Sequence, residues 1–207
     1  DFQPQGTPDK HVLLNLVRLT RQPIAAGTLN PGYIIGRQGI QVGLTAANTA
    51  GFSFAKLEPY AQYPGDWLPP KGCLVVNPSE NGDQCVSANV LVDTGIPQSY
   101  MTVPVGTKLT TVQAPDASEP KKMIGVLAKG NSVSVSFPAT APFIATDSFT
   151  IGGGTPVEPV QVIPSVVDTR PPFINTGRHF LRQYQFLYDA KQGYLGIKHQ
   201  PNPCGET

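Results

Sequence analysis

The chain has 207 residues, which is enough for one large or two small domains with a substantial buried core. Charged residues make up only 14% of it, the formal net charge is +1, and no basic block extends beyond Lys121-Lys122. Nucleic acid and membrane surfaces are therefore not expected as partners. No apolar run reaches 18 residues, so no membrane span is predicted either.

The composition favours a mainly β protein. The chain holds 21 glycines and 22 prolines beside 40% hydrophobic residues. So much Gly and Pro in an apolar chain indicates many turns between short strands rather than disorder. The chain begins at Asp1 instead of Met, which suggests a removed leader, a processed chain or a trimmed one. With its low charge, the chain is expected to be secreted or at the cell surface.

The first 32 residues read differently from the rest. Residues 1–10 are polar and rich in Pro, which is typical of a loosely held arm. Residues 11–19 fit either a helix capped by Asp9 or a buried strand, and residues 20–32 read as a connector. Residues 1–32 are therefore predicted to be an N-terminal arm or the remnant of a preceding lobe.

From residue 33 the pattern changes to short apolar or β-branched runs separated by turn residues. Residues 58–72 are expected to form an aromatic-rich surface loop. The tail over 177–197 is expected to mix a short helix with closing strands. The predicted strands cover 33–35, 40–44, 52–57, 86–92, 108–113, 121–128, 132–137, 143–151 and 157–167.

Three cysteines are present. Cys73 and Cys85 bracket a turn-rich loop, and a disulfide between them would add about 2–3 kcal/mol; the alternative is two separate thiols. Cys204 is either free or bonded to a segment missing from this chain. No His/Cys pair has the spacing of zinc ligands, so neither a metal nor a cofactor is expected.

One short motif suggests catalysis. The apolar run Val90-Leu91-Val92 leads straight into Asp93-Thr94-Gly95. A carboxylate on such a turn sits at the mouth of a β-domain, half wrapped in apolar side chains, where its pKa can be tuned for acid/base chemistry. Asp and Gly are common turn residues, so the motif is weak by itself. A second element downstream, FINTGRHFLRQYQFLYD over 173–189, strengthens it.

Together these elements resemble the C-terminal lobe of the pepsin-like aspartic peptidases. That lobe has a DTG turn, an apolar-apolar-Gly element, FLR-x-Y, an aromatic strand ending in Asp, and a closing strand that contains Gly. The spacing from Asp93 to Gly177 is similar, and INTGRHFL is more similar to bacterial members than to animal ones. The resemblance covers residues 33–200 and leaves 201–207 as a C-terminal tail.

The resemblance implies a pepsin-like acid-protease lobe, with closed or orthogonal β-barrel-like sheets and a few short helices. It implies an aspartic endopeptidase that hydrolyses polypeptides with water activated between two aspartates. Asp93 would be the catalytic residue of this chain. Thr94, Gly95 and Ile96 would support the active-site turn. Ile174 and Gly177 would pack beneath the turn, where a glycine permits close approach.

This chain supplies one such aspartate, whereas the reaction needs two. The second lobe is expected from a missing N-terminal chain or from a homodimer partner. Three departures from the family pattern also matter. Ile96 stands where pepsin-like enzymes usually carry Ser or Thr to bond the carboxylate, Asn175-Thr176 replaces the usual Leu, and His179 stands where an acidic or polar residue is usual. A non-catalytic pepsin-like binding or structural module is therefore the alternative function.

Overall fold

The computed structural model describes residues 8–200, and the expected tail with Cys204 lies outside the described residues. The chain divides into two compact units. The first comprises the residues up to Pro70 together with those from Gln183 onward, and the second runs from Lys71 to Arg182. The lobe boundaries expected at residues 33 and 200 do not coincide with this division and stay a prediction. Among residues 8–200, no helix is long and apolar enough to cross a membrane.

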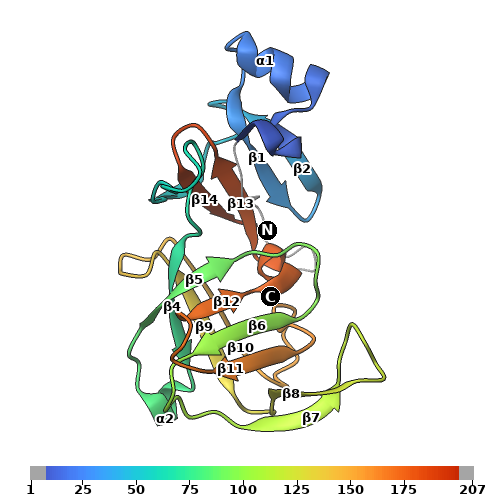
Figure 1. The fold of residues 1–207 in the computed structure, drawn as a ribbon, viewed down its shortest axis with the longest axis vertical. Coiled ribbons are helices and arrows are strands. Elements are labelled where there is room, and N and C mark those ends of the chain that lie inside the picture. The colour runs from blue at the N-terminus through green and yellow to red at the C-terminus, as the bar shows by residue number, and fades with distance from the viewer. Residues whose placement is uncertain (1–7, 201–207) are drawn as a thin grey trace. The chain divides into compact units, whose positions relative to one another are not determined.

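The first unit is built on a five-stranded antiparallel sheet with the order β2-β1-β13-β14-β3 (Figure 1). Its core gathers Ile34, Leu44, Phe52 and Leu187. The strands are β1 (Asn30–Gly36), β2 (Gly39–Leu44), β3 (Ser53–Lys56), β13 (Tyr184–Asp189) and β14 (Tyr194–His199). Four short helical segments precede them: Pro8–Lys10, Val12–Leu14, Val17–Arg21 and α1 (Gln22–Ala25).

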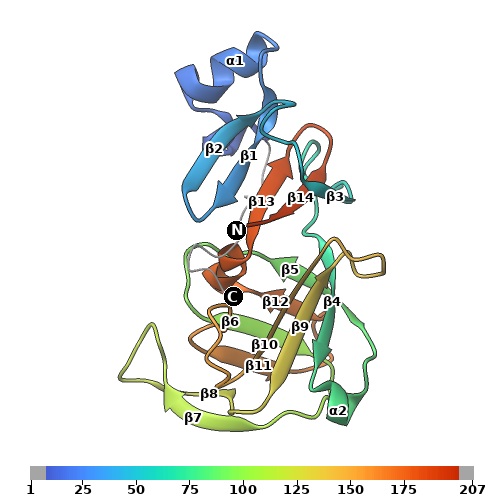
Figure 2. The same ribbon diagram turned by 180° about the vertical axis from the view of Figure 1, so that it is seen from behind.

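The second unit is built on a seven-stranded mixed sheet with the order β10-β9-β4-β5-β12-β6-β11. Figures 1 and 2 show that this sheet is curled, because β9 and β10 run steeply across the direction of β6 and β11. Its strands are β4 (Lys71–Val76), β5 (Val86–Leu91), β6 (Ser99–Val103), β9 (Ser132–Phe137), β10 (Ala145–Thr150), β11 (Val162–Val166) and β12 (Phe173–Asn175). The other elements are a two-stranded sheet of β7 (Thr111–Pro115) and β8 (Met123–Leu127), the short α2 (Pro78–Asn81), and the 3-10 helix Gly177–Arg182.

Alternating side chains explain why the second sheet has an apolar core. In β9 the residues Val133 and Val135 are 1% exposed, whereas the serines between and before them are more accessible. β10 alternates in the same way, with the buried Ala145, Asp147 and Phe149 on one face. This period of two is what one packed face of a strand requires. The mainly β fold is thereby confirmed.

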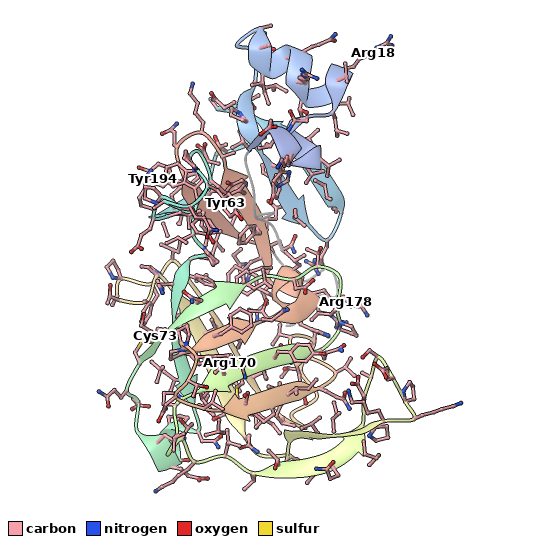
Figure 3. The ribbon with its side chains drawn as sticks, viewed as in Figure 1. Arg18, Tyr63, Cys73, Arg170, Arg178 and Tyr194 are labelled. Atoms are coloured by element: carbon pink, nitrogen blue, oxygen red, sulfur yellow. A yellow bond between two sulfur atoms is a disulfide. The ribbon has the colours of Figure 1, made fainter. Side chains whose placement is uncertain are left out.

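The predicted disulfide is also confirmed. Cys73 lies on β4, where Figure 3 labels it, and bonds Cys85 just before β5. Their Cα atoms are 5.1 Å apart, which is within the range that a disulfide spans. The bond closes the loop that contains α2, and so ties β4 to the strand that leads into the Asp93 turn.

Several elements differ from the predictions. Residues 11–19 form neither a regular α-helix nor a strand, and the first turn is capped by His11 rather than Asp9: the Leu13 N–H donates to His11 Nδ1 at 3.2 Å. The strand expected at 108–113 begins only at Thr111. β4 begins inside the loop expected over 58–72 and was not predicted. The mixture of a short helix and closing strands expected over 177–197 is confirmed, since a 3-10 helix precedes β13 and β14.

Candidate active site

The Asp93 turn joins two strands that are not neighbours in the sheet. β5 ends at Leu91 and β6 begins at Ser99, and β12 lies between them. β12 runs parallel to β5 and antiparallel to β6, as Figure 1 shows, so that Asn175 is paired with both Leu91 and Tyr100. The result is a ψ-shaped arrangement in which the end of β12 lies next to the turn that carries Asp93.

Both oxygens of the Asp93 carboxylate accept a hydrogen bond from an amide. The Gly95 N–H donates to Oδ1 at 2.9 Å, and the Asn175 side-chain Nδ2–H donates to Oδ2 at 3.0 Å. Asp93 itself is half-buried, whereas Thr94 and Gly95 are exposed. A substrate or a water molecule can therefore reach the carboxylate from the solvent side of the turn.

The surroundings of Asp93 act on its pKa in opposite directions. Partial burial raises the pKa of the carboxyl group, because it disfavours the charged form. The hydrogen bonds from Asn175 and Gly95 stabilise the carboxylate and outweigh burial, so that the pKa lies below its usual value. Asp93 is consequently ionised at neutral pH and through the mildly acidic range.

Gly177 lies directly beneath the turn. Its φ is +62°, and a Cβ there would collide with the Gln98 carbonyl oxygen and lie 3.1 Å from that of Ile96. The neighbouring Arg178 N–H donates to the Ile96 carbonyl at 3.0 Å. Arg178 extends its side chain outward, as labelled in Figure 3. Only glycine fits this combination of a left-handed backbone and a close backbone contact.

The other residues predicted for the site fall in three environments. Ile174 is 1% exposed and pairs with Val90 and Met101 in the centre of the sheet. Ile96 is half-buried and contributes its backbone carbonyl, but no polar side-chain atom, to the turn. The Thr94 hydroxyl has no hydrogen-bond partner within residues 8–200. The structure thus brings Asp93, Gly95, Ile96 and Gly177 together and leaves Thr94 facing outward.

The sequence reasoning missed the part that Asn175 plays. It treated Asn175 only as a change in packing, whereas the structure places its carboxamide on the Asp93 carboxylate. The sequence contained a signal for this role. Relative to the pepsin-like pattern, Ile96 lacks the usual polar side chain in the turn, and Asn175 introduces one. Considering the two departures together would have suggested that one compensates for the other.

His179 lies behind the turn and is buried, with 4% of its surface exposed. Burial lowers the pKa of the imidazole, and the positive charge of Arg182 lowers it further. The Pro97 and Pro156 carbonyls act in the opposite direction, yet neither ring nitrogen has a hydrogen bond of normal geometry within the described part of the chain. A neutral imidazole therefore supports the turn from below as a packing group.

Within the described part of the chain, no second carboxyl group is bonded to Asp93. Among residues 8–200, Asp93 accepts hydrogen bonds only from Gly95 and Asn175, and no group of three or more His, Cys, Asp or Glu residues has the geometry of a metal site. Asp147, on the edge strand β10, is 3% exposed, and burial raises its pKa to about 7.

A cavity of about 510 Å³ lies in the first unit. Its walls are mainly apolar and include Leu44, Phe54 and Leu187, with Asp189 at one side and Tyr194 (Figure 3) at another. The Asp189 Oδ1 accepts hydrogen bonds from the backbone N–H groups of Lys191 and Gln192. The cavity offers an apolar surface with one carboxylate and does not involve Asp93.

No protein-family model matches the chain, and no curated protein sequence matches it. Among solved structures, the basic 7S globulin from soybean is similar, with a TM-score of 0.47 and 13% identity over 88% of this chain and 55% of that one. An aspartic proteinase from Irpex lacteus gives a TM-score of 0.43 and 12% identity over 86% and 59%. The chain spans little more than half the length of either structure.

Proposed function

We propose that this chain is one lobe of an aspartic endopeptidase and that Asp93 is its catalytic carboxylate. The observation that supports the proposal is the geometry of the turn: a half-buried aspartate follows a buried strand, and amide donors hold both of its oxygens. Gly177, in contact with the backbone of the same turn, fixes the position of the carboxylate. Thr94 and Gly95 are exposed and available to a partner loop.

The chemistry requires a second aspartate on the other side of one water molecule. The ionised carboxylate removes a proton from the water as the water attacks the peptide carbonyl carbon, and the protonated carboxyl group donates its proton to the carbonyl oxygen. In the second half of the reaction the first aspartate returns its proton to the amide nitrogen. The other aspartate takes a proton back from the intermediate as the C–N bond breaks.

Two sources of the second aspartate are compatible with this proposal. One is an N-terminal lobe on a preceding or separate chain, and the other is a second copy of this chain related by a two-fold axis. In either case the unpartnered Thr94 hydroxyl would bond the loop of the partner. Polypeptides are the proposed substrates. A secreted or cell-surface location is proposed as well, since the Cys73–Cys85 disulfide is compatible with an oxidising compartment.

The test compares peptide hydrolysis between about pH 3 and 7 for the wild type and Asp93→Asn. A transition-state-mimicking inhibitor of aspartic peptidases and sedimentation are run in parallel. We expect the variant to lose activity by at least about 100-fold. Asp83→Asn changes an exposed aspartate in the disulfide loop and should retain activity. Cleavage that survives Asp93→Asn would refute the proposal, and the sedimentation mass distinguishes a dimer from a lobe that needs another chain.

A non-catalytic binding module is the second candidate function. The observation that favours it is the apolar cavity of the first unit, which is independent of Asp93. This reading predicts that the folded chain cleaves nothing, and that it binds peptides equally well with and without Asp93→Asn.

A further inference from the structure

We propose that Asn175 is the positioning residue of the Asp93 site, and that its carboxamide holds Asp93 as the ionised, water-activating member of the aspartate pair. The first half of this inference concerns only the residues of this chain. The second half deepens the proposed peptidase function and rests on it for the other carboxyl group.

The hydrogen bonds around Asn175 fix which way its carboxamide points. The Gly177 N–H, which can only donate, bonds the side-chain Oδ1 of Asn175 at 2.9 Å. The NH₂ group must then lie on the other side of the carboxamide, where it meets Asp93 Oδ2 at 3.0 Å. Asn175 is thus a bridge that joins the backbone of Gly177 to the Asp93 carboxylate with a defined polarity.

The strand that carries Asn175 is held from both sides. Asn175 is paired with Leu91 of β5 and with Tyr100 of β6, and the next residue, Thr176, donates its backbone N–H to the Leu91 carbonyl at 2.9 Å. Only 7% of the Asn175 surface is exposed, whereas Asp93 is half-buried. Substrate can therefore reach Asp93 but not Asn175, and the carboxamide acts through the carboxylate rather than on substrate.

The donors on Asp93 determine which protonation state is favoured. An amide N–H gives a hydrogen bond to a carboxylate oxygen and cannot accept one from a carboxylic O–H. Asp93 receives one such bond on each oxygen, and each oxygen keeps a further lone pair for a water molecule. An identical copy of this chain would carry the same donors, so the second half of the inference applies to a second carboxyl group supplied by a different lobe. In a pair of carboxyl groups that share one proton, the proton then resides on the partner that lacks these donors. Asp93 is left to accept the proton of the attacking water.

Two substitutions separate the donor role of Asn175 from its role in packing. Asn175→Leu keeps the branched shape of the side chain and adds no charge, but it removes the donor to Asp93. Asn175→Ala removes the donor and the bulk of the side chain together. Asn89→Ala is the matched control, because Asn89 lies on β5 and its side chain bonds Lys71 at 2.6 Å and not Asp93.

The Asp93 carboxyl group is titrated by carbon NMR in the intact chain, which requires no catalytic activity. We expect Asn175→Leu and Asn175→Ala each to move the Asp93 titration upward by about one pH unit, and Asn89→Ala to leave it unchanged. In an active preparation, the acid limb of kcat/KM should move upward by the same amount in both Asn175 variants. If Asn175→Leu titrates like the wild type, the donor role is wrong. If Asn175→Ala alone moves the titration, the side chain acts by packing and the inference is overturned.

The outcomes also separate this inference from the proposed function. A wild type that stays inactive together with its second lobe, and whose Asp93 titration depends on Asn175, would refute the peptidase and with it the water-activating role, but not the hydrogen bond that holds Asp93. If the enzyme is active and the acid limb of its kcat/KM profile does not move in either Asn175 variant, the inference is refuted and the proposed peptidase function is retained.

Discussion

The α-carbon of Gly177 faces the carbonyl oxygen of Gln98 so closely that no side chain fits between them. The contact joins the start of the 3-10 helix Gly177–Arg182 to the far end of the Asp93 turn. As a consequence, backbone atoms on both sides of this contact fix the distance between the Asp93 turn and the sheet. Such a contact is less adaptable than one between flexible side chains.

Gly177→Ala should therefore destabilise the protein by about 2–4 kcal/mol, as the backbone strain adds to a steric clash. Gly27→Ala is the matched control. Gly27 also has a positive φ, +72°, but a Cβ there would meet nothing within 4 Å, so that only about 1 kcal/mol of strain is expected. Urea unfolding of both variants measures the difference. Equal losses of unfolding free energy would contradict the role given to the Gln98 contact.

Asp147 should make stability depend on pH in the direction opposite to most carboxyl groups. Burial raises its pKa from 3.8 to about 7 in the folded state. The folded state therefore binds the proton more tightly than the unfolded state, so this contribution is fully present below about pH 4 and is lost as the pH rises to about 7. Asp147→Asn should raise the unfolding free energy at pH 8 by about 2–4 kcal/mol and have little effect at pH 4. Thermal unfolding across this range, with Asp83→Asn as the exposed control, provides the measurement; an equal effect at both pH values would rule out the buried carboxyl as the cause.

Removing the disulfide should weaken the second unit. Cys73 and Cys85 are separated by 12 residues, and closing a loop of this size in the unfolded chain is worth about 3 kcal/mol. The double variant Cys73→Ser/Cys85→Ser should lose about that much unfolding free energy. Adding reductant should lower the stability of the wild type and leave the double variant unaffected. A double variant as stable as the oxidised wild type would show that the bond contributes nothing.

Ile96→Ser should add a hydroxyl group at the position where pepsin-like enzymes usually carry Ser or Thr. If that hydroxyl bonds the carboxylate beside Gly95 and Asn175, the Asp93 titration should move downward by about half a pH unit. Ile96→Val, which adds no donor, is the control. A titration that does not respond to Ile96→Ser would indicate that Asn175 has already taken the place of this donor.

Local patterns in the sequence were sufficient for much of the fold. The alternation in residues 132–137 predicts β9 because Val133 and Val135 must share one face of a packed strand. Cys73 and Cys85 were paired because a turn-rich loop brings their ends together. Asp93 and Gly177 were found by the spacing of two motifs. The structure then places these two residues in one turn-and-strand arrangement.

The parts of the fold and of the site that were not predicted depend on contacts that a local sequence pattern does not reveal. β4 was missed because its apolar residues follow one another without alternation, directly after a Pro-rich loop. Residues 11–19 form short 3-10 and π segments, which an apolar period does not distinguish from a helix or strand. The hydrogen bond from Asn175 to Asp93 could not be predicted, because it depends on the insertion of β12 between β5 and β6.

That insertion also has a consequence for the order of events during synthesis. Asp93 and Asn175 are 82 residues apart in the chain, and β12 is parallel to β5, so the two cannot meet through a local hairpin. While the chain emerges from the ribosome, Asp93 lacks its side-chain partner until nearly the whole second unit has been made. A prematurely ended chain would contain the aspartate but not the group that holds it, and we expect such a fragment to be inert. Under the proposed peptidase function, completion of the chain would thus act as a safeguard against cleavage of neighbouring proteins during synthesis.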